Sequence, residues 1–330
     1  ASAQKKFSVY AVGFYNQENL FDTCHDEGKK DYEYLPNKGW NGMKYTNKLR
    51  NMSKALADMG TDVLPNVGCA FIGLSEVENH KVLDALVDQA PLKARNMKYV
   101  HIEGPDRRGI DCALLYNPSL FSVKNVKLLP YVQELAKDSA FFTRGFLTVR
   151  GEMAGDDVAV IVCHWPSRFS GPFYRESAAR QVKVIKDSLL NVNQEMKIFV
   201  MGDMNDDPVN KSMHVYLQAK PEISQVGAGD MYNPWYNVLA KEGKGTLFYS
   251  GNWNLFDQIV ITPNLLNKDA KKKDYSSLKY WKSHIFRRDY LIQQEGQYKG
   301  APLRTTAGGR WLNGYSDHLP VVMYLVKEKK

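Results

Sequence analysis

The chain has 330 residues, of which 44% are apolar and 24% are charged, and this composition indicates a globular protein with a substantial core. No stretch approaches the roughly 20 apolar residues that a membrane-spanning helix needs, and the four cysteines lack the C-x-x-C spacing of a zinc site. The formal net charge of +8 at pH 7 favours an anionic partner.

The first residues, ASAQKKF, lack both the basic start and the apolar core of a signal peptide. Small residues followed by a polar run resemble what remains after a signal peptide has been cleaved. We therefore expect an exported protein, periplasmic or secreted, with its signal peptide removed. No feature implies a stable protein partner, and we expect a monomer. The cysteines leave the redox compartment undecided.

Apolar, β-rich runs recur along the chain and predict strands. In chain order they are FSVYAVGFY (7–15), CAFIGLSEV (69–77), MKYVHIE (97–103), IDCALLYNP (110–118), GFLTVRGEM (145–153), VAVIVCHW (158–165), MKIFVMGDM (196–204), LFDQIVIT (255–262) and HLPVVMYLV (318–326). Apolar residues that return at three- and four-residue steps predict helices over 43–60, 80–90 and 175–194, and Gly60 is well placed to end the first. Elsewhere strand follows strand, so we expect mixed sheets. No linker or repeat divides the chain, and we expect one domain over 1–330.

Polar and charged side chains gather where these strands end. The run IFVMG, for example, leads directly into Asp203 and Asn205. Asp and Asn are also ordinary turn residues, so one such cluster by itself carries little weight. Similar residues follow the other strands: Asn16, Glu18, Glu76, His164, Asp257, Asp317 and His318. Oxygen donors without thiolates suit Mg²⁺ or Mn²⁺, and a His–Asp pair beside such an ion suits phosphoryl chemistry.

The ordered motifs NQENLF, LSEVEN, HWPSR, GDMND, FDQIV and SDHLP resemble those of the endonuclease/exonuclease/phosphatase superfamily. That superfamily includes DNase I-like nucleases, abasic-site endonucleases, neutral sphingomyelinases and inositol polyphosphate 5-phosphatases. The resemblance runs from Asn16 to the final strand. It implies an α/β fold, the DNase I-like four-layer sandwich, in which two mixed β-sheets pack face to face with flanking helices. It also implies an active site at one edge of the sandwich.

The resemblance implies a metal role for four residues. Glu76 is similar to the principal Mg²⁺ (or Mn²⁺) ligand of the family, supported by Asn16, Glu18 and Asp317. These are oxygen-bearing side chains, as a hard divalent cation requires.

Five further residues take catalytic roles by the same resemblance. His318 resembles the general base that activates water, and Asp257 would hold its ring in the useful tautomer. Asp203 and Asn205 would orient the nucleophile and the scissile phosphate. His164 would donate a hydrogen bond or a proton to that phosphate as charge develops.

Three more residues are candidates for binding the substrate beside Asn205. Arg144 and Arg168 have the forked donors that suit phosphate, although surface salt bridges are an equally good interpretation. Asp111 would reach His164 as an orienting carboxylate, or else face solvent from its strand.

Most of the excess positive charge lies in one segment. Residues 268–310 hold eleven Lys or Arg against four Asp or Glu, interleaved with aromatic residues. This segment belongs to an insertion at about 264–315, between the last two strands of the family. Cations among aromatic rings suit a nucleic acid, although an anionic membrane surface or a plain solvated insertion fits the same pattern.

These features together predict a metal-dependent phosphodiesterase, first of all an endonuclease acting on DNA or RNA. Fold and catalytic residues do not choose among substrates, so a phosphatase or phospholipase-C-like enzyme acting on inositol phosphates or sphingomyelin is the alternative. A second alternative is an inactive nucleic-acid-binding module that has kept the fold.

Overall fold

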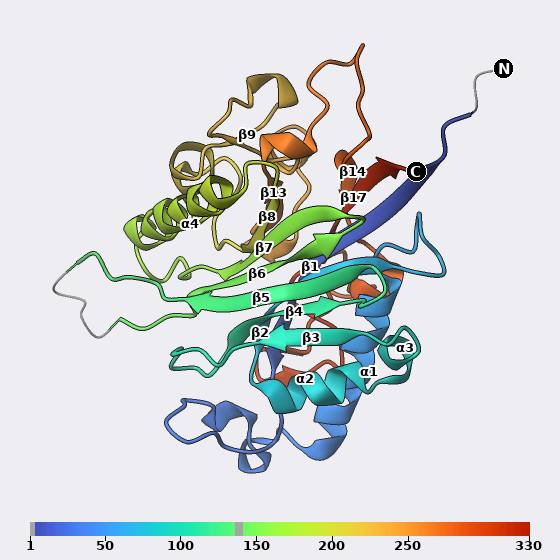
Figure 1. The fold of residues 1–330 in the computed structure, drawn as a ribbon. Helices are drawn as coiled ribbons and strands as arrows, with labels where there is room; N and C mark the ends of the chain where they lie inside the picture. The colour runs from blue at the N-terminus through green and yellow to red at the C-terminus, as the bar shows by residue number, and fades with distance from the viewer. Residues whose placement is uncertain (1–3, 136–140) are drawn as a thin grey trace.

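A computed structural model describes residues 4–135 and 141–330, and two large β-sheets dominate it (Figure 1). The first sheet has the strand order β14-β17-β1-β2-β4-β3. Its strands are β1 (Phe7–Leu20), β2 (Cys69–Val77), β3 (Lys98–His101), β4 (Asp111–Tyr116), β14 (Lys279–Ile285) and β17 (Val321–Glu328). β1 runs parallel to β2 and antiparallel to β17, so the sheet is mixed, as the sequence predicts.

The second sheet has the order β5-β6-β7-β8-β13-β10-β9. Its strands are β5 (Phe121–Leu129), β6 (Phe146–Met153), β7 (Asp156–His164), β8 (Lys197–Asp203), β9 (Ala219–Lys220), β10 (Met231–Tyr232) and β13 (Asp257–Ile261). β7 is parallel to β8, and β8 is antiparallel to β13. Two hairpins stand apart: β11 (Leu247–Tyr249) with β12 (Asn252–Asn254), and β15 (Thr306–Ala307) with β16 (Arg310–Trp311).

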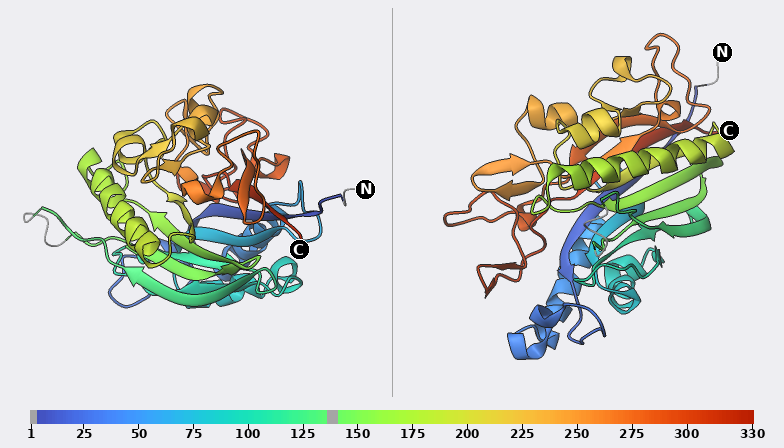
Figure 2. Two further views of the ribbon diagram at one scale, coloured as in Figure 1. Left: turned by 45° about the horizontal axis from the view of Figure 1, so that its top comes forward. Right: turned by 90° about the vertical axis from the view of Figure 1, so that its left-hand side faces the viewer.

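Helices cover the outer face of each sheet. α1 (Gly42–Asp58), α2 (His80–Val87) and α3 (Ala90–Lys93) contribute to the core outside the first sheet, and α4 (Pro172–Val192) packs on the second. Figure 2 shows α4 and the α1–α3 group on opposite sides of the paired sheets. The shorter helices are η1 (Tyr32–Tyr34), η2 (Pro36–Lys38), η4 (Ser212–Tyr216), η5 (Ile223–Gln225), α5 (Tyr236–Ala240), η6 (Pro263–Leu265) and η7 (Asp289–Leu291). No helix in the described residues is both long enough and apolar enough to cross a bilayer.

Strand alternation builds the layers. In β1, Val12 and Phe14 point into the core between the sheets, where they share one cluster with Met201 of β8. Their neighbours Ala11 and Tyr15 belong to the cluster under α1. Successive side chains of a strand face opposite sides, so the apolar strand β1 contributes both to the core between the sheets and to the core under α1. The predicted four-layer, DNase I-like sandwich is confirmed.

Local sequence explains where the predicted helices begin and end. The side chain of Asn41 accepts the N–H of Lys44 and caps α1, and Gly60, in the left-handed region at φ +80°, lies two residues beyond its last residue. Asn79 caps α2 by accepting the N–H of Val82. α4 begins at Pro172, earlier than the predicted start, because proline is favoured in the first helical turn.

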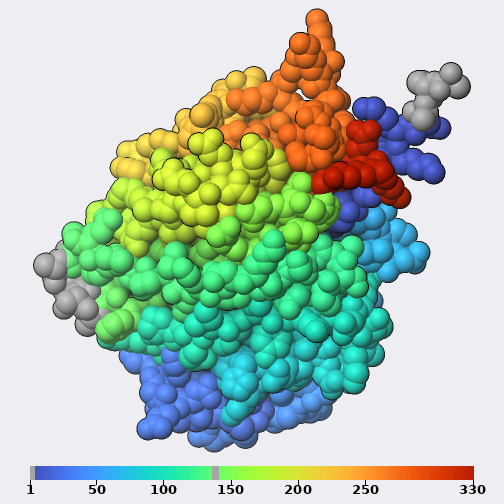
Figure 3. All heavy atoms as spheres, in the orientation of Figure 1, coloured from blue at the N-terminus to red at the C-terminus, as the bar shows by residue number. Residues whose placement is uncertain are grey.

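The segment 264–315 is more than a surface connection. Part of it forms β14, which extends the first sheet beside β17. The loop between η6 and β14, which carries Lys271, Lys272 and Lys273, forms the projection at the top of Figures 1 and 3. Tyr275 from this loop packs against Phe7, at the opposite end of β1 from Asn16. The basic residues of the segment are therefore spread over separate parts of the fold and do not form one strip.

Candidate active site

The polar strand ends predicted from sequence meet at one edge of the sandwich. Because β7 and β8 are parallel and in register, His164 pairs with Asp203, and Asp203 pairs in turn with Asp257 on β13. β1 and β2 are also parallel, so Asn16 and Glu76 end at the same edge of the first sheet. The edge therefore collects these residues from both sheets.

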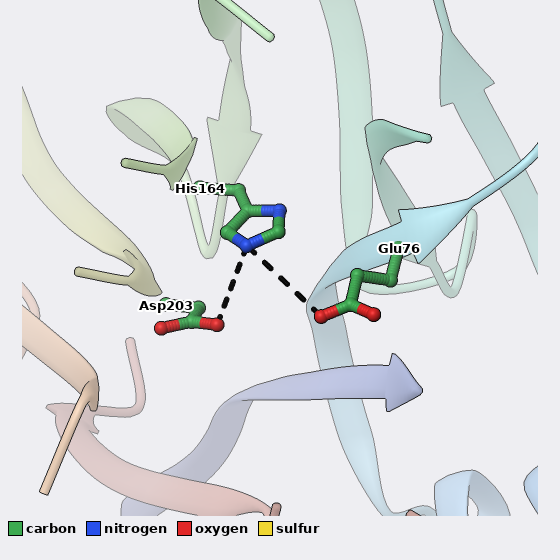
Figure 4. A group of neighbouring side chains, drawn as sticks. All are labelled: Glu76, His164 and Asp203. Atoms are coloured by element: carbon green, nitrogen blue, oxygen red, sulfur yellow. Dashed lines mark ion pairs between the residues drawn. The ribbon is translucent and has the colours of Figure 1, made fainter. Parts of the chain in front are cut away.

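Glu76, His164 and Asp203 form the centre of this edge, and Figure 4 shows their side chains pointing toward one another. Nε2 of His164 lies 3.4 Å from Oδ2 of Asp203 and 4.0 Å from Oε2 of Glu76. The Nδ2 amide of Asn16 donates to both carboxylates, at 2.7 Å to Glu76 and 3.0 Å to Asp203. Asn16 thus joins the two sheets through their acidic side chains.

His318 is held in a second group beside the first. Its Nδ1 donates to Oδ2 of Asp257 at 2.7 Å, and the hydroxyl of Thr246 donates to the same oxygen at 2.5 Å. The other ring nitrogen, Nε2, lies 3.8 Å from Oδ2 of Asp203. All four residues are buried. The imidazole is therefore fixed in orientation, with Nε2 directed at the centre of the site.

Glu18 and Asp317 form a third group, and Oδ1 of Asp317 lies 3.8 Å from Nε2 of His318. The backbone N–H groups of Thr305 and Thr306 donate to the Glu18 carboxylate. Arg304 lies between the two acids, 3.6 Å from Glu18 and 3.7 Å from Asp317. Glu76 also accepts a backbone N–H, that of Asn19, but its other oxygen faces Asn16 and His164 at the centre of the site.

Lys48, which the sequence did not single out, is a buried cation whose charge acts on Glu18 and Asp317. Its ammonium is fully buried and donates to the hydroxyl of Thr305 at 2.5 Å and to the carbonyl of Tyr315 at 2.6 Å. Burial lowers the pKa of Lys48 to about 8, although Glu18 and Asp317 act in the opposite direction. The signal in the sequence was a lysine beside Leu49 on the apolar face of a predicted helix.

Burial and crowding change the pKa values of the acids. Burial raises the pKa of Asp203 to about 7; Asp257 and Glu76 add to this rise, and His318 opposes it. Burial, with repulsion from Asp317, raises the pKa of Glu18 to about 7. Like charges that converge in a buried site favour protonation unless a cation joins them.

The two imidazoles shift in opposite directions. Burial lowers the pKa of His164 well below its usual value, helped by the nearby Arg144 and Arg108. Burial would lower the pKa of His318 as well, but the surrounding carboxylates, Asp257 first among them, raise it well above the usual value. His164 is therefore neutral near pH 7, whereas the surrounding carboxylates favour the protonated form of His318. A divalent cation beside these carboxylates would offset their charge and favour the neutral imidazole.

Strained backbone marks the same edge. Glu18, Asn19, Glu76 and Asn205 all have positive φ, between +42° and +59°, a region that residues other than glycine seldom adopt. Such conformations cost roughly 1–3 kcal/mol each and cluster at functional sites. At this edge the residues with positive φ change the direction of the backbone near the strand ends, so that the polar side chains point into the site.

The donors at the centre fit a hard divalent cation. Ligand atoms of Glu76, His164 and Asp203 lie within 4.8 Å of one another, and so do those of Asp203, Asp257 and His318. Carboxylates dominate and no thiolate is present in either group, and oxygen donors of this kind are the ligands that a hard cation prefers. A cation here would be held by Glu76 and Asp203. Asn16, in the orientation found, directs its N–H group at these acids and positions them.

One predicted contact is wrong, and one predicted phosphate-binding residue is held by the protein itself. Asp111 does not reach His164: its Oδ2 lies 2.7 Å from Nε2 of His101, the neighbour across β3 and β4. Nδ1 of His164 is buried and has no hydrogen-bond partner among the described residues. Arg144 is a structural residue in its described contacts, because it donates to the carbonyls of His164 and Trp165 and pairs with Asp106 at 3.1 Å.

Arg168 and Asn205 lie side by side at the rim. Nε of Arg168 donates to the carbonyl of Asn205. The guanidinium also contacts Asp206, Asp207 and Asn210 and lies over the ring of Phe256. The Asn205 amide donates to the carbonyl of Trp165 at 2.7 Å, which leaves its second N–H for other partners. Arg168 is partly exposed, so it stays a candidate for phosphate binding.

Arg108, which the sequence analysis did not single out, lies 3.7 Å from Glu76 and is also partly exposed.

Carboxylates that could hold a divalent cation and an oriented imidazole, together at the edge of two packed sheets, are the groups that hydrolysis of a phosphoric ester requires. The family model described as "Endonuclease/Exonuclease/phosphatase family" matches residues 11–327, and the chain belongs to this family. Members of the family hydrolyse phosphoric esters. No curated protein sequence matches the chain.

Solved structures with this fold are similar over nearly the whole chain but distant in sequence. A mannosyl-6-phosphatase of Bacteroides thetaiotaomicron is 14% identical, with a TM-score of 0.58 and coverage of 96% of this chain and 99% of the other. An endonuclease/exonuclease/phosphatase family protein of the same species is 13% identical, with a TM-score of 0.58 and coverage of 98% and 97%. A humanized TDP2 of D. rerio is 12% identical, with a TM-score of 0.54 and coverage of 96% and 98%. At these identities the likeness shows the fold alone.

Proposed function

We propose that this protein is a divalent-metal-dependent hydrolase of phosphodiester bonds in nucleic acid. The observation that carries the proposal is the His318 imidazole, bonded through Nδ1 to Asp257 and directed through Nε2 at the carboxylate oxygens of Asp203 and Asp317, each 3.8 Å away. A general base held in one tautomer beside a cation site is what hydrolytic attack on phosphorus requires.

Each residue has a defined part in this reaction. His318 removes a proton from the attacking water through Nε2, and Asp257 stabilises the imidazolium that forms. Asp203 and Asn205 orient the water and the phosphate. Neutral His164 donates a hydrogen bond to a phosphate oxygen as charge develops there. Mg²⁺ or Mn²⁺, when held by Glu76 and Asp203, supplies positive charge to the phosphoryl oxygens.

The rim of the site favours nucleic acid as the substrate. Three partly exposed arginines, Arg108, Arg168 and Arg304, lie around the acidic centre and offer forked donors to backbone phosphates. Phe169 is exposed next to Arg168, and Tyr249 is exposed two residues beyond Leu247, which bridges to His318. Exposed aromatic rings beside cations suit stacked bases. One of the solved structures with this fold is a D. rerio TDP2 with a single-strand DNA product.

A phosphatase of soluble sugar or inositol phosphates is the second candidate. The mannosyl-6-phosphatase of similar fold favours it, since the same catalytic residues can serve a phosphomonoester. A phospholipase-C-like action on sphingomyelin and an inactive nucleic-acid-binding module complete the alternatives. The retained catalytic groups argue against the inactive module.

A substrate panel separates these candidates. Plasmid DNA, single-stranded DNA, RNA, sphingomyelin, inositol phosphates and mannose 6-phosphate are each incubated with Mg²⁺ or with excess chelator. We expect cleavage of a nucleic acid that chelator abolishes and that His318→Ala lacks. Release of phosphate from a sugar phosphate alone would favour the phosphatase, and undiminished cleavage in chelator would refute the metal role.

Export and a monomeric state stay predictions. The export prediction depends on the N-terminal residues, of which 1–3 lie outside the described part of the chain.

A further inference from the structure

A cavity of about 700 Å³ lies next to the catalytic edge and is not lined by Glu76, His164, Asp203, Asp257 or His318. Its walls are the β11–β12 hairpin, the loop that follows α5, the edge strand β14 and the turn at 299–301. We call it the hairpin cavity. Its size is within the roughly 300–1,000 Å³ range of pockets that bind small molecules.

Apolar and aromatic side chains form the inner part of the hairpin cavity. Phe248 and Trp253 pair across the hairpin with their ring centroids 5.2 Å apart, and Ile285 and Leu319 line the cavity as well. Phe248 and Trp253 are only partly buried, although they are large apolar rings. A planar apolar group that stacked on these rings would shield them from water.

The mouth of the hairpin cavity is basic. Lys244, Arg287 and Lys299 all line it, all three are exposed, and Glu242 is the only carboxylate among the lining residues. Lys244 lies 3.7 Å from Glu242, whereas Arg287 and Lys299 make no ion pair with a described residue. Two cations at the mouth therefore lack a countercharge, and an anionic group suits this position.

The walls of this cavity are directly bonded to the catalytic residues. Leu319 follows His318 in the chain, and its N–H donates to the carbonyl of Thr246 at 2.8 Å. Thr246 in turn donates to Asp257, the residue that orients His318. Leu247 of the hairpin bridges to His318. A molecule in the hairpin cavity would thus rest against the backbone that positions the general base.

We propose that the hairpin cavity is a nucleotide-binding site. The base stacks against Phe248 and Trp253, and the phosphate lies among Lys244, Arg287 and Lys299. Two sources share this chemistry: a nucleotide unit of the substrate strand beside the scissile bond, or a free mononucleotide. The first source rests on the proposed function, whereas nucleotide binding itself does not.

Calorimetric titration with AMP in excess chelator tests the site without hydrolysis. We expect saturable binding to the wild-type chain and binding weaker by about tenfold or more in Arg287→Ala/Lys299→Ala. The matched control is Lys271→Ala/Lys272→Ala, which removes the same charge from the exposed loop at the far end of β1 and should leave AMP affinity unchanged. Trp253→Leu, which keeps every charge, should weaken AMP binding but not the weaker binding of inorganic phosphate.

Further titrations define the ligand and its source. Ribose 5-phosphate and adenosine, which each lack one of the two recognised parts, should both bind more weakly than AMP. With Mg²⁺ present, competition between AMP and a single-stranded oligonucleotide assigns the cavity to the strand, and AMP binding without competition assigns it to a free nucleotide. The proposal is overturned if AMP shows no saturable binding, if the paired substitutions change nothing, or if ribose 5-phosphate binds as tightly as AMP.

Discussion

Asp257 and His318 lie 61 residues apart in the chain, and the buried carboxylate of Asp257 bonds Nδ1 of His318 at 2.7 Å. The oxygen that accepts this bond also accepts the hydroxyl of Thr246. Asp257 is fully buried, so its charge is not screened by water. The pair therefore fixes both the orientation and the basicity of the imidazole, and the proposed chemistry depends on it.

Removal of the base should stop turnover while the fold persists. We expect His318→Ala to lower kcat by about 10²–10⁴-fold, the usual contribution of a general base. Asp257→Asn should impair the same step, because an amide N–H facing Nδ1 favours the wrong tautomer. Steady-state kinetics on the cleaved substrate measures both, with circular dichroism as the control for folding. Near-normal turnover of His318→Ala between pH 6 and 8 would assign the base to another residue.

Without a cation, the acidic centre should make stability fall as pH rises. Glu18 and Asp203 have pKa values raised to about 7, so each contributes stability that is present below the unfolded-state pKa and lost as pH rises through about 7. We therefore expect a lower Tm at pH 8 than at pH 5 in excess chelator. Mg²⁺ should raise the Tm more at pH 8 than at pH 5, because binding requires ionised carboxylates.

Differential scanning calorimetry at the two pH values, with and without Mg²⁺, checks this. Glu76→Gln is the matched variant, because it removes one charge from the centre and should abolish most of the Mg²⁺-dependent rise. Glu152→Gln, at an exposed carboxylate beside Lys124, is the control and should respond as the wild type does. A Tm that rises by the same amount with Mg²⁺ at both pH values would contradict the assignment of the buried acids.

Lys48 should stabilise the segment that carries Asp317 and His318. Lys48→Met removes the donor to Thr305 and Tyr315 and leaves Glu18 and Asp317 without their buried cation. A hydrogen bond to a charged group typically contributes about 1.5–3 kcal/mol, so we expect a loss of this order in the unfolding free energy. Urea denaturation measures it. Arg50→Met, on the same helix but exposed, should cost less than about 0.5 kcal/mol.

If nucleic acid is the substrate, its affinity for the protein should fall as the salt concentration rises. Cations at the rim of the site should contribute more to this affinity than cations far from it. Arg108→Ala and Arg304→Ala, at the rim of the site, should each reduce the dependence of log K on log salt by about 0.7 to 0.9 for each phosphate that the arginine neutralises. Joint substitution of Lys271, Lys272 and Lys273 by Ala should act on long DNA only, because their loop lies at the opposite end of β1. Filter binding with short and long DNA compares them. A DNA affinity that changes neither with salt nor with any of these substitutions would contradict nucleic acid as the preferred substrate.

The sequence by itself determined the sandwich and the composition of its catalytic edge. Strands such as 158–165 and 196–204 are recognisable because a buried strand needs a continuous apolar run, and the polar residues that end them follow directly in the chain. Parallel neighbours in register then bring His164 and Asp203 to the same edge. Only local pattern and pairing are needed, so sequence reasoning placed these residues correctly.

The sequence pattern did not predict the less regular elements. β5 alternates apolar residues with lysines at the edge of its sheet, and β14 lies inside the basic segment, so neither shows a continuous apolar run. The π-helix η4 and the β11–β12 hairpin are too short to show a period.

Only the tertiary structure decided which charged groups meet. Asp111 pairs with His101 and not with His164, because strand register places it on β4 opposite β3. Lys48 bonds Thr305, 257 residues away, and Asn16 bridges Glu76 to Asp203. These contacts depend on the path of non-repetitive loops, in which side-chain direction follows no period. A sequence can therefore predict which polar residues reach the edge of the sandwich, whereas their pairing, their burial and hence their pKa values exist only once the chain has folded.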